Sequence, residues 1–251
     1  MAYFTTTVDC EILGSRQHVA AFSVHDNLFT WQEFEIPKGG AKLVGVTALI
    51  RGKGDATSTN NVFPFSLVFG RKAASDATNE PTTNSIAFLT AAITKDIYGS
   101  IEIEATDFVG AAKDNNCLAI ATTGGNKASS IVLTQDSETP TGNPGYDKFY
   151  VAGIAQGAFD FITLNRINDA NIATVSPGTT LVSDGSGMDI REQIMVGDVL
   201  VAHDDAVIGT VATLTNGTTT ELTEDIATGV LVHQDFIYVK HPITLQLHFE
   251  N

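Results

Sequence analysis

A hairpin signal in residues 197–223 constrains the fold of this chain more than any other feature. The stretch reads GDVLVAHDDAVIGTVATLTNGTTTELT, and its short apolar runs are interrupted first by Asp204-Asp205 and then by Asn216-Gly217. An Asn-Gly pair between strand-like runs is a strong hairpin signal, because both central residues of a type I′ turn need a positive φ. The stretch contains no nucleophile–base pair, metal-ligand spacing or phosphate-binding loop. It therefore predicts a compact β module and gives no indication of catalysis.

Strand patterns also dominate the rest of the chain. Near the C-terminus, polar residues alternate with the apolar residues Ile243, Leu245, Leu247 and Phe249. Such alternation is typical of a strand in a sheet with one wet face. Further strands are predicted at residues 4–12, 19–24, 30–36, 42–51, 64–70, 97–103, 118–122, 130–134 and 148–152. Helix signals are confined to the spacing of apolar residues at 86–97 and to one or two turns at 189–195.

The order of these segments predicts a chain in two parts. Residues 156–236 have the pattern of a self-contained β module, whereas residues 241–249 resemble the long amphipathic strands of the first half. Insertions enter a fold at its loops. We therefore expect an all-β chain with a jelly-roll-like β-sandwich at 1–155, completed by 237–251, and a small β-barrel-like module inserted at 156–236. Pairing of residues 241–249 only inside the module would contradict this prediction.

The charge balance argues against several classes of partner. The chain has 29 acidic and 14 basic residues, a formal net charge of −15, and only 17% charged residues. Nucleic acids and anionic membrane surfaces are bound through clustered Lys and Arg, so we expect neither as a partner. No apolar run approaches the ~20 residues of a membrane span. The N-terminus lacks the basic and apolar regions of a Sec-type signal peptide, so none is expected.

No residue spacing predicts a metal centre or a cofactor site. None of the six histidines forms an HxH, HxxxH or HExxH pair: His18, His25, His203, His233, His241 and His248. Asp204-Asp205 with the nearby Asp198, or the segment DGSGMD at 184–189, could bind Ca²⁺, but neither matches an EF-hand loop. Aspartate is also a common turn former, and we favour that interpretation over a calcium site. We expect no metal and no cofactor.

The remaining candidate site residues have structural explanations too. Glu102 and Glu104 share one face of a strand, as a glycosidase pair could, but that face has the pattern of a solvated surface. Trp31 is the only tryptophan and could form a sugar-binding platform, although a sandwich core needs the same residue type. Two buried thiols at Cys10 and Cys117 are favoured over a disulfide. No GxSxG, P-loop or GxGxxG motif is present, so we expect no enzyme activity.

Several segments resemble structural proteins of tailed bacteriophages, marine phages in particular. TWQEFEIPKGGAKLVGVTALIRGKGD, FPFSLVFGRK and IYGSIEIEATDF are similar to the β-sandwich portion of such proteins. The stretch 197–223, followed by DFIYVKHPITLQLHF, resembles the small β module near their C-terminus. Together these segments cover less than half of the chain. The resemblance implies a non-enzymatic virion component and assigns no catalytic residue to any position here.

We therefore expect a capsid decoration or cement protein that binds the major capsid protein, or other virion proteins, and stabilises the shell from outside. Proteins of this kind act in many copies, so a homo-oligomer is expected and a trimer is favoured. Assembly would take place in the host cytoplasm. The alternatives are a tail, portal-vertex or fibre component, and a carbohydrate-binding host-attachment module that uses Trp31 or loop aromatics.

Overall fold

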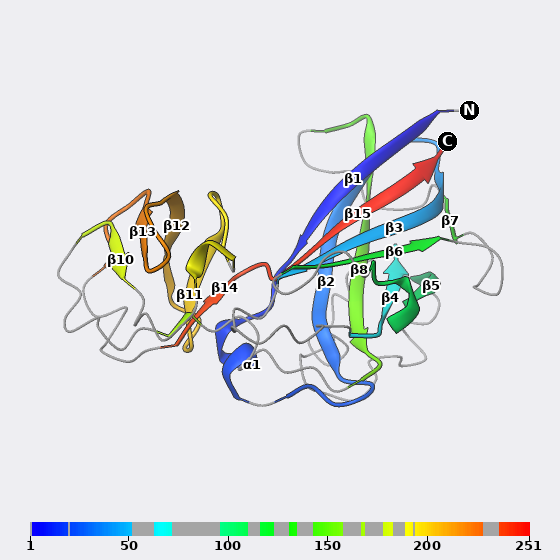
Figure 1. The fold of residues 1–251 in the computed structure, drawn as a ribbon. Coiled ribbons are helices and arrows are strands. Elements are labelled where there is room, and N and C mark those ends of the chain that lie inside the picture. The colour runs from blue at the N-terminus through cyan, green and yellow to red at the C-terminus, as the bar shows by residue number, and fades with distance from the viewer. Residues whose placement is uncertain are drawn as a thin grey trace.

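The computed structural model describes residues 2–19, 21–51, 63–71, 96–109, 116–122, 131–134, 143–157, 167–168, 178–182, 189–192, 194–227 and 236–251. Their regular structure is almost entirely antiparallel β, which confirms the predicted fold class. Two sheets form a sandwich, and a third sheet forms a separate module beside it (Figure 1).

The first sheet of the sandwich has the order β1–β15–β3–β6, and β7 pairs with the other end of β3. The strands are β1 (Tyr3–Cys10), β3 (Ala41–Arg51), β6 (Asn116–Thr122), β7 (Ile131–Leu133) and β15 (Ile243–Glu250). β15 lies between β1 and β3, and Leu247 pairs with Thr6 on one side and with Val46 on the other. The last strand is thus central to the sandwich, which is the pairing that its alternation predicts.

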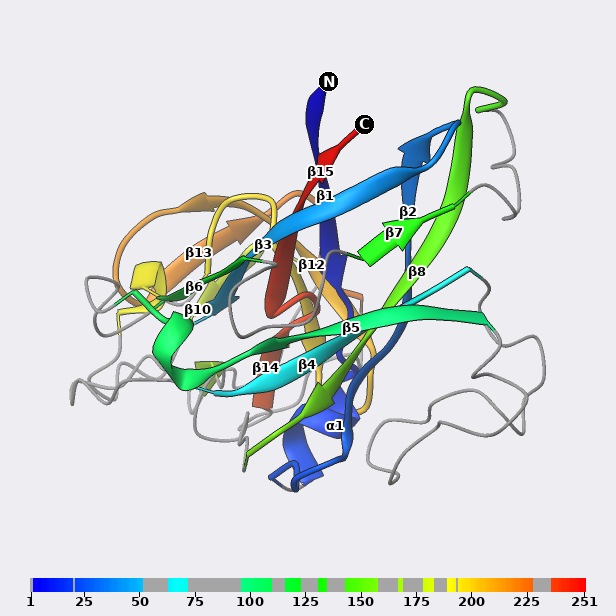
Figure 2. The ribbon, with the colours of Figure 1, turned by 90° about the vertical axis from the view of Figure 1, so that its right-hand side faces the viewer.

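The second sheet of the sandwich has the order β2–β8–β4–β5 (Figure 2). Its strands are β2 (Asn27–Pro37), β4 (Phe65–Gly70), β5 (Ile97–Ile103) and β8 (Tyr146–Ala155). The chain places β1 in the first sheet, β2 in the second and β3 in the first. It then places β4 and β5 in the second sheet, β6 in the first, β8 in the second and β15 in the first. This alternation gives the two Greek keys of a jelly roll.

The core of the sandwich fills the space between these sheets. The four apolar residues of β15 that alternate in the sequence are fully buried there. Phe34 lies at the centre, with its ring centroid 6.2 Å from Phe69, 6.0 Å from Phe149 and 6.1 Å from Phe249. Because these rings come from both sheets, their burial joins the two layers.

The third sheet forms the module and has the order β10–β13–β12–β11–β14–β9. Its strands are β9 (Ile167–Asn168), β10 (Thr180–Val182), β11 (Val199–Ala202), β12 (Val207–Leu214), β13 (Thr219–Leu222) and β14 (Phe236–Val239). A second apolar core, built around Leu200, Val211 and Ile237, is separate from that of the sandwich. β14 pairs with β11 and β9, so the strands of the module extend to Val239, beyond the predicted boundary at 236.

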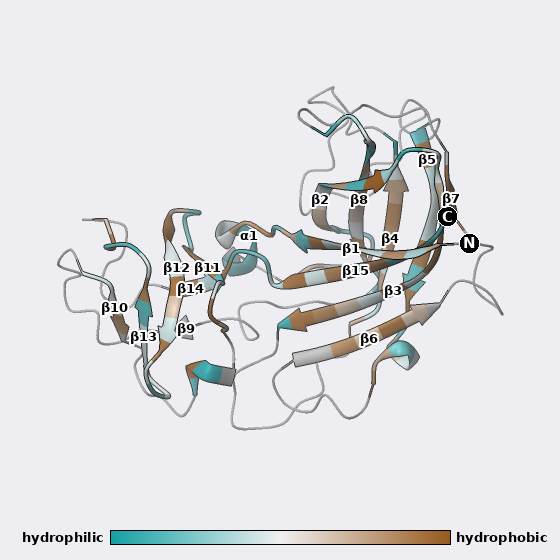
Figure 3. Ribbon diagram, turned by 90° about the horizontal axis from the view of Figure 1, so that it is seen from above, coloured by the Kyte–Doolittle hydropathy of each residue, from teal (hydrophilic) through white to brown (hydrophobic). Residues whose placement is uncertain are grey.

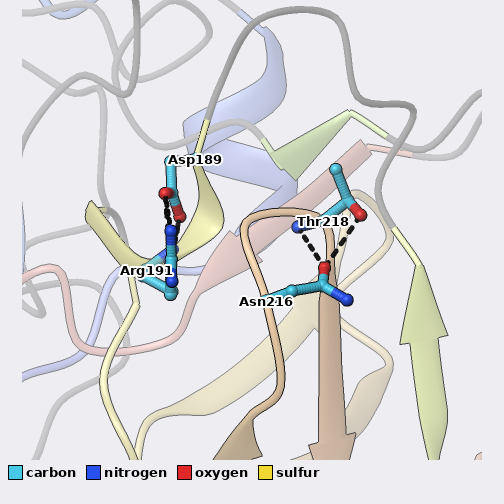
Figure 4. A network of polar contacts seen from close by, with 4 residues as sticks. All are labelled: Asp189, Arg191, Asn216 and Thr218. Atoms are coloured by element: carbon cyan, nitrogen blue, oxygen red, sulfur yellow. Dashed lines mark hydrogen bonds and ion pairs between the residues drawn. The ribbon is translucent and has the colours of Figure 1, made fainter.

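The Asn216-Gly217 hairpin is present, but its predicted turn type is wrong. The turn joins β12 to β13, yet neither residue has a positive φ, so it is not type I′. The side-chain oxygen Oδ1 of Asn216 accepts hydrogen bonds from the backbone N (2.9 Å) and Oγ1 (3.0 Å) of Thr218 (Figure 4). The backbone N atoms of Thr215 and Asn216 also donate to the carbonyl of Thr219, at 2.9 and 3.2 Å, so side-chain and backbone hydrogen bonds close the turn together.

One further local prediction differs from the structure. Residues 19–24 were predicted as a strand, but Val19 ends a short helix, α1 (Gly14–Val19), and Phe22 forms only a single β-bridge. The helical turn predicted within 189–195 is present as one turn of 3₁₀ helix, η3 (Ile190–Glu192), and another, η2 (Ala105–Asp107), follows β5. The helical spacing at 86–97 lies outside the described residues except at its end, where Ile97 begins β5.

Candidate functional site

The predicted candidate residues do not converge on one site. His248 lies on the outer face of the first sheet, and His25 is exposed in the turn before β2, with a φ of 75°. His233 lies outside the described residues. His18 on α1 contacts the module, with its Nδ1 2.9 Å from the hydroxyl of Tyr238 and its ring centroid 5.3 Å from that of His203. The part of the chain that the structure describes holds no group of three His, Cys, Asp or Glu side chains able to bind a metal ion.

The aspartates considered as calcium ligands have separate partners. Both carboxylate oxygens of Asp205 accept hydrogen bonds from Ser15, one from its backbone N and one from its Oγ, each at 2.8 Å. Asp204 accepts one from the backbone N of Ala206 at 3.1 Å, as a turn former would. The segment 184–188 lies outside the described residues. Asp205, in the turn between β11 and β12 of the module, therefore holds the start of α1. Its sequence context did not indicate this role.

Glu102 is exposed on β5, and Glu104 is exposed just before η2, as expected for a solvated surface. Trp31 differs from the favoured prediction because it lies outside the main core. It packs with Val68 and Ala152 in a small cluster on the second sheet. A register shift in β2 between Phe29 and Gln32 breaks the simple alternation there, so the position of Trp31 could not be derived from sequence parity.

The structure describes the side chain of one of the two cysteines, Cys10. Cys10 is a free thiol with no exposed surface in the sandwich core. Burial, followed by the nearby charge of Asp9, raises its pKa well above the usual value, so the thiol stays protonated and unreactive. The backbone of Cys117 pairs with Ile50 in the first sheet, but its side chain lies outside the described residues.

A buried ion pair connects the sandwich to the module. Arg51, the last residue of β3, donates from Nη2 to Oδ1 of Asp198 at 2.7 Å, and their side chains are only 5% and 9% exposed. The other oxygen of Asp198 accepts a hydrogen bond from the backbone N of Met195 at 2.8 Å. Burial raises the pKa of Asp198, and these favourable contacts oppose that shift only in part. Removing either charge would leave the other buried without it.

Contacts from α1 to backbone carbonyls hold the same junction on the side of the helix. The side chain of Gln17 is fully buried and donates from Nε2 to the carbonyls of Ile12 (2.7 Å) and Val239 (2.9 Å). Gly14 approaches the module so closely that a Cβ atom would lie 2.0 Å from the carbonyl oxygen of Ala202. Figure 3 shows α1 between the two parts. The module is thus docked on the sandwich in one orientation by contacts from both the strand and the helix.

A pocket of about 290 Å³ opens where the module meets the first sheet. Its walls include Leu49 from the sandwich and the exposed side chains of Met195 and Val196 from the module. Its polar groups already have structural partners, since Thr244 donates to Asp9 at 2.8 Å and the Arg51–Asp198 pair is internally neutralised. Burial, then the nearby Lys240, lowers the pKa of His241 in its wall. The described wall of the pocket thus combines apolar side chains with polar groups that contact one another.

The junction residues were missed by sequence reasoning. Arg51 carries the one recoverable signal, because a cation that directly follows the apolar run of β3 is well placed to be buried and paired. Asp198 and Asp205 read as ordinary turn formers, and Gln17 lies in a segment with no clear periodicity. Their partners come from residues about 150 to 220 positions away in the chain, which no local pattern reveals.

Searches of known protein families, curated proteins and solved structures gave no match to this chain. Within the described residues, no helix has the length and apolar character that a membrane crossing would require.

Proposed function

We propose that this chain is a non-enzymatic structural protein of a tailed-phage virion, a capsid decoration or cement protein that acts as a homo-oligomer, with a trimer favoured. The junction between sandwich and module is the observation that carries the proposal. A protein that bridges two subunits of a shell resists their separation only if its own two parts keep their relative orientation. The buried Arg51–Asp198 pair and the buried Gln17 contacts supply that stiffness.

The surface character and the architecture support the same role. A net charge of −15 suits a protein that faces away from the packaged genome, where phosphate neutralisation is not required. The jelly roll and the module each have their own core, so each can present a separate contact surface. The proposed partners are the major capsid protein or other virion proteins, and the proposed location is the exterior of the capsid.

The experiment compares virions that carry this chain with virions from which its gene has been deleted. The proposal predicts that shells without the chain rupture at lower temperature and under milder osmotic shock. Complementation with the Asp198→Ala variant, which loosens the junction, should restore binding to the shell more fully than it restores stability. Intact shells of unchanged stability after deletion would contradict the cement role.

A carbohydrate-binding host-attachment module is the second candidate, and the position of Trp31 favours it. The side chain is half-buried on the second sheet, outside the main core, where a ligand could reach an aromatic surface. Because Trp31 is the only tryptophan, its fluorescence reports directly on this position. Quenching or a spectral shift on addition of host glycans would support this candidate, and an unchanged spectrum would count against it. A tail, portal-vertex or fibre component is distinguished by its location in the particle.

A further inference from the structure

The outer face of the first sheet carries no charged side chain at its centre. The antiparallel registers align one row of outward residues across β1, β15, β3 and β6, namely Thr7, Gln246, Thr47 and Ile120. In the next row, His248 lies opposite Thr5. We call these six side chains the central face.

Charged residues of this sheet lie only near the ends of its strands. Strands β6 and β7 contain none, and the other three contain Asp9, Lys42, Arg51 and Glu250. Lys42 and Glu250 pair with each other at 3.6 Å, and Arg51 is buried at the module junction. The second sheet has exposed charged residues within its strands, namely Glu33 in β2, which pairs with Lys148 at 2.9 Å, and Glu102 in β5. The central face is therefore a neutral area on a strongly acidic protein.

The polar side chains of the central face are held in place before any partner binds. Nδ1 of His248 lies 3.1 Å from Oγ1 of Thr5, and Nε2 lies 3.0 Å from Oγ1 of Thr47. A ring bonded through both nitrogens has little freedom left to lose on association. Ile120 is 48% exposed beside this row, and Val132 on β7 is 53% exposed further along the sheet. The face thus combines ordered polar groups with exposed apolar surface.

We propose that copies of this chain associate with one another through the central face. Each copy carries a net charge of −15, so close approach between two copies is opposed wherever acidic side chains meet. The central face removes this repulsion and offers hydroxyl, amide and apolar groups for contact. The inference adds to the proposed function by assigning the contact between copies, but it concerns the chain alone and is tested without the virion.

The test measures self-association of the purified chain by sedimentation equilibrium over the widest soluble concentration range. The wild type should form an oligomer of defined size. Gln246→Glu should weaken association at least about tenfold, because it would place a negative charge in the contact between copies that already repel each other. Thr7→Glu, on the edge strand β1, provides a second variant in case Gln246→Glu does not fold. Ser100→Glu is the matched control, since Ser100 is exposed in β5 of the second sheet.

Three results would overturn the inference: a wild type that stays monomeric at all concentrations, association that neither Gln246→Glu nor Thr7→Glu weakens, and equal weakening by Ser100→Glu. Circular dichroism of each variant separates lost association from lost folding. A monomeric wild type would leave the shell-binding proposal standing, because deletion of the gene from the phage tests that role separately. Conversely, self-association with no effect of deletion would sink the cement role alone.

Discussion

Arg51 and Asp198 show how much one pair of side chains can decide in this molecule. Their charges are almost wholly buried where the sandwich meets the module, and their nearest atoms lie 2.7 Å apart. The contact is worth little as a net source of stability, because both ions lose their hydration. The pair instead favours the observed orientation of the module, in which both groups are satisfied.

Truncation of Asp198 tests this role. Asp198→Ala leaves the guanidinium of Arg51 buried without its carboxylate, so the free energy of unfolding should fall by about 3–5 kcal/mol. Chemical denaturation followed by circular dichroism measures the change. Glu224→Ala removes an exposed acid of the same module and should change stability by no more than about 0.5 kcal/mol. A similar small effect for both variants would show that the pair does not hold the junction.

The raised pKa of Asp198 predicts a specific pH dependence. The folded state binds a proton at this group more tightly than the unfolded state does, so the contribution of the group to stability is greatest at low pH. That contribution is lost as the pH rises through the folded pKa. The wild type should therefore gain stability relative to Asp198→Asn when the pH is lowered from neutral into the acidic range. Denaturation curves of both proteins across this range measure the difference, and a constant or opposite trend would refute the prediction.

Gly14 tests how close the two parts must approach. In Gly14→Ala the new methyl group would clash with a backbone carbonyl, which cannot move without displacing β11. We expect a loss of about 1–3 kcal/mol or more in unfolding free energy and faster proteolysis at the junction. Gly145→Ala is the matched control, because a Cβ atom there meets nothing within 4 Å. Equal melting temperatures for the two variants would contradict the close docking described here.

At the scale of elements, alternation was the reliable predictor. The strand predicted at 97–103 is observed at Ile97–Ile103, and the alternating residues 243–249 lie in β15 (Ile243–Glu250). The pattern of β15 is clear because burial on one face of a sheet selects every second residue. Helix α1 had no such pattern, and contacts from Asp205 and Gln17 to distant residues hold it instead. The presence of a strand could therefore be predicted from the local sequence, whereas the helix and the junction depend on tertiary contacts.

The side chain of Asn216 contributes to the stability of the turn between β12 and β13. Asn216→Ala removes the acceptor for two hydrogen bonds from Thr218, so we expect a loss of about 0.5–1.5 kcal/mol. Asn216→Asp keeps the acceptor and should be close to the wild type. Asn216→Gly distinguishes the two turn types, since a type I′ turn would accept glycine without loss. Thermal unfolding of the three variants measures these differences. A fully stable Asn216→Gly protein would favour a type I′ turn over the observed one.

At the scale of the whole molecule, the chain is a jelly roll with a second β unit fixed to its flank. The termini pair at one end of the sandwich, where the backbone N of Ala2 donates to Asn251 and that of Asn251 donates back to Ala2, at 3.1 and 2.8 Å (Figure 1). The module is docked at the opposite end of the same strands, beside Arg51 and Ile243. Contacts made by the two ends would therefore be mechanically linked through the central strands β15 and β3.

The proposed cement role fixes where this chain lies in a purified virion and how many copies of it are present. A reconstruction of the particle by cryo-electron microscopy measures both. A cement protein should give density for the jelly roll and the module on the outside of the shell, at a fixed ratio to the major capsid protein, with the two parts touching different subunits. Density confined to the tail or portal vertex, or a particle that lacks the chain, would contradict it.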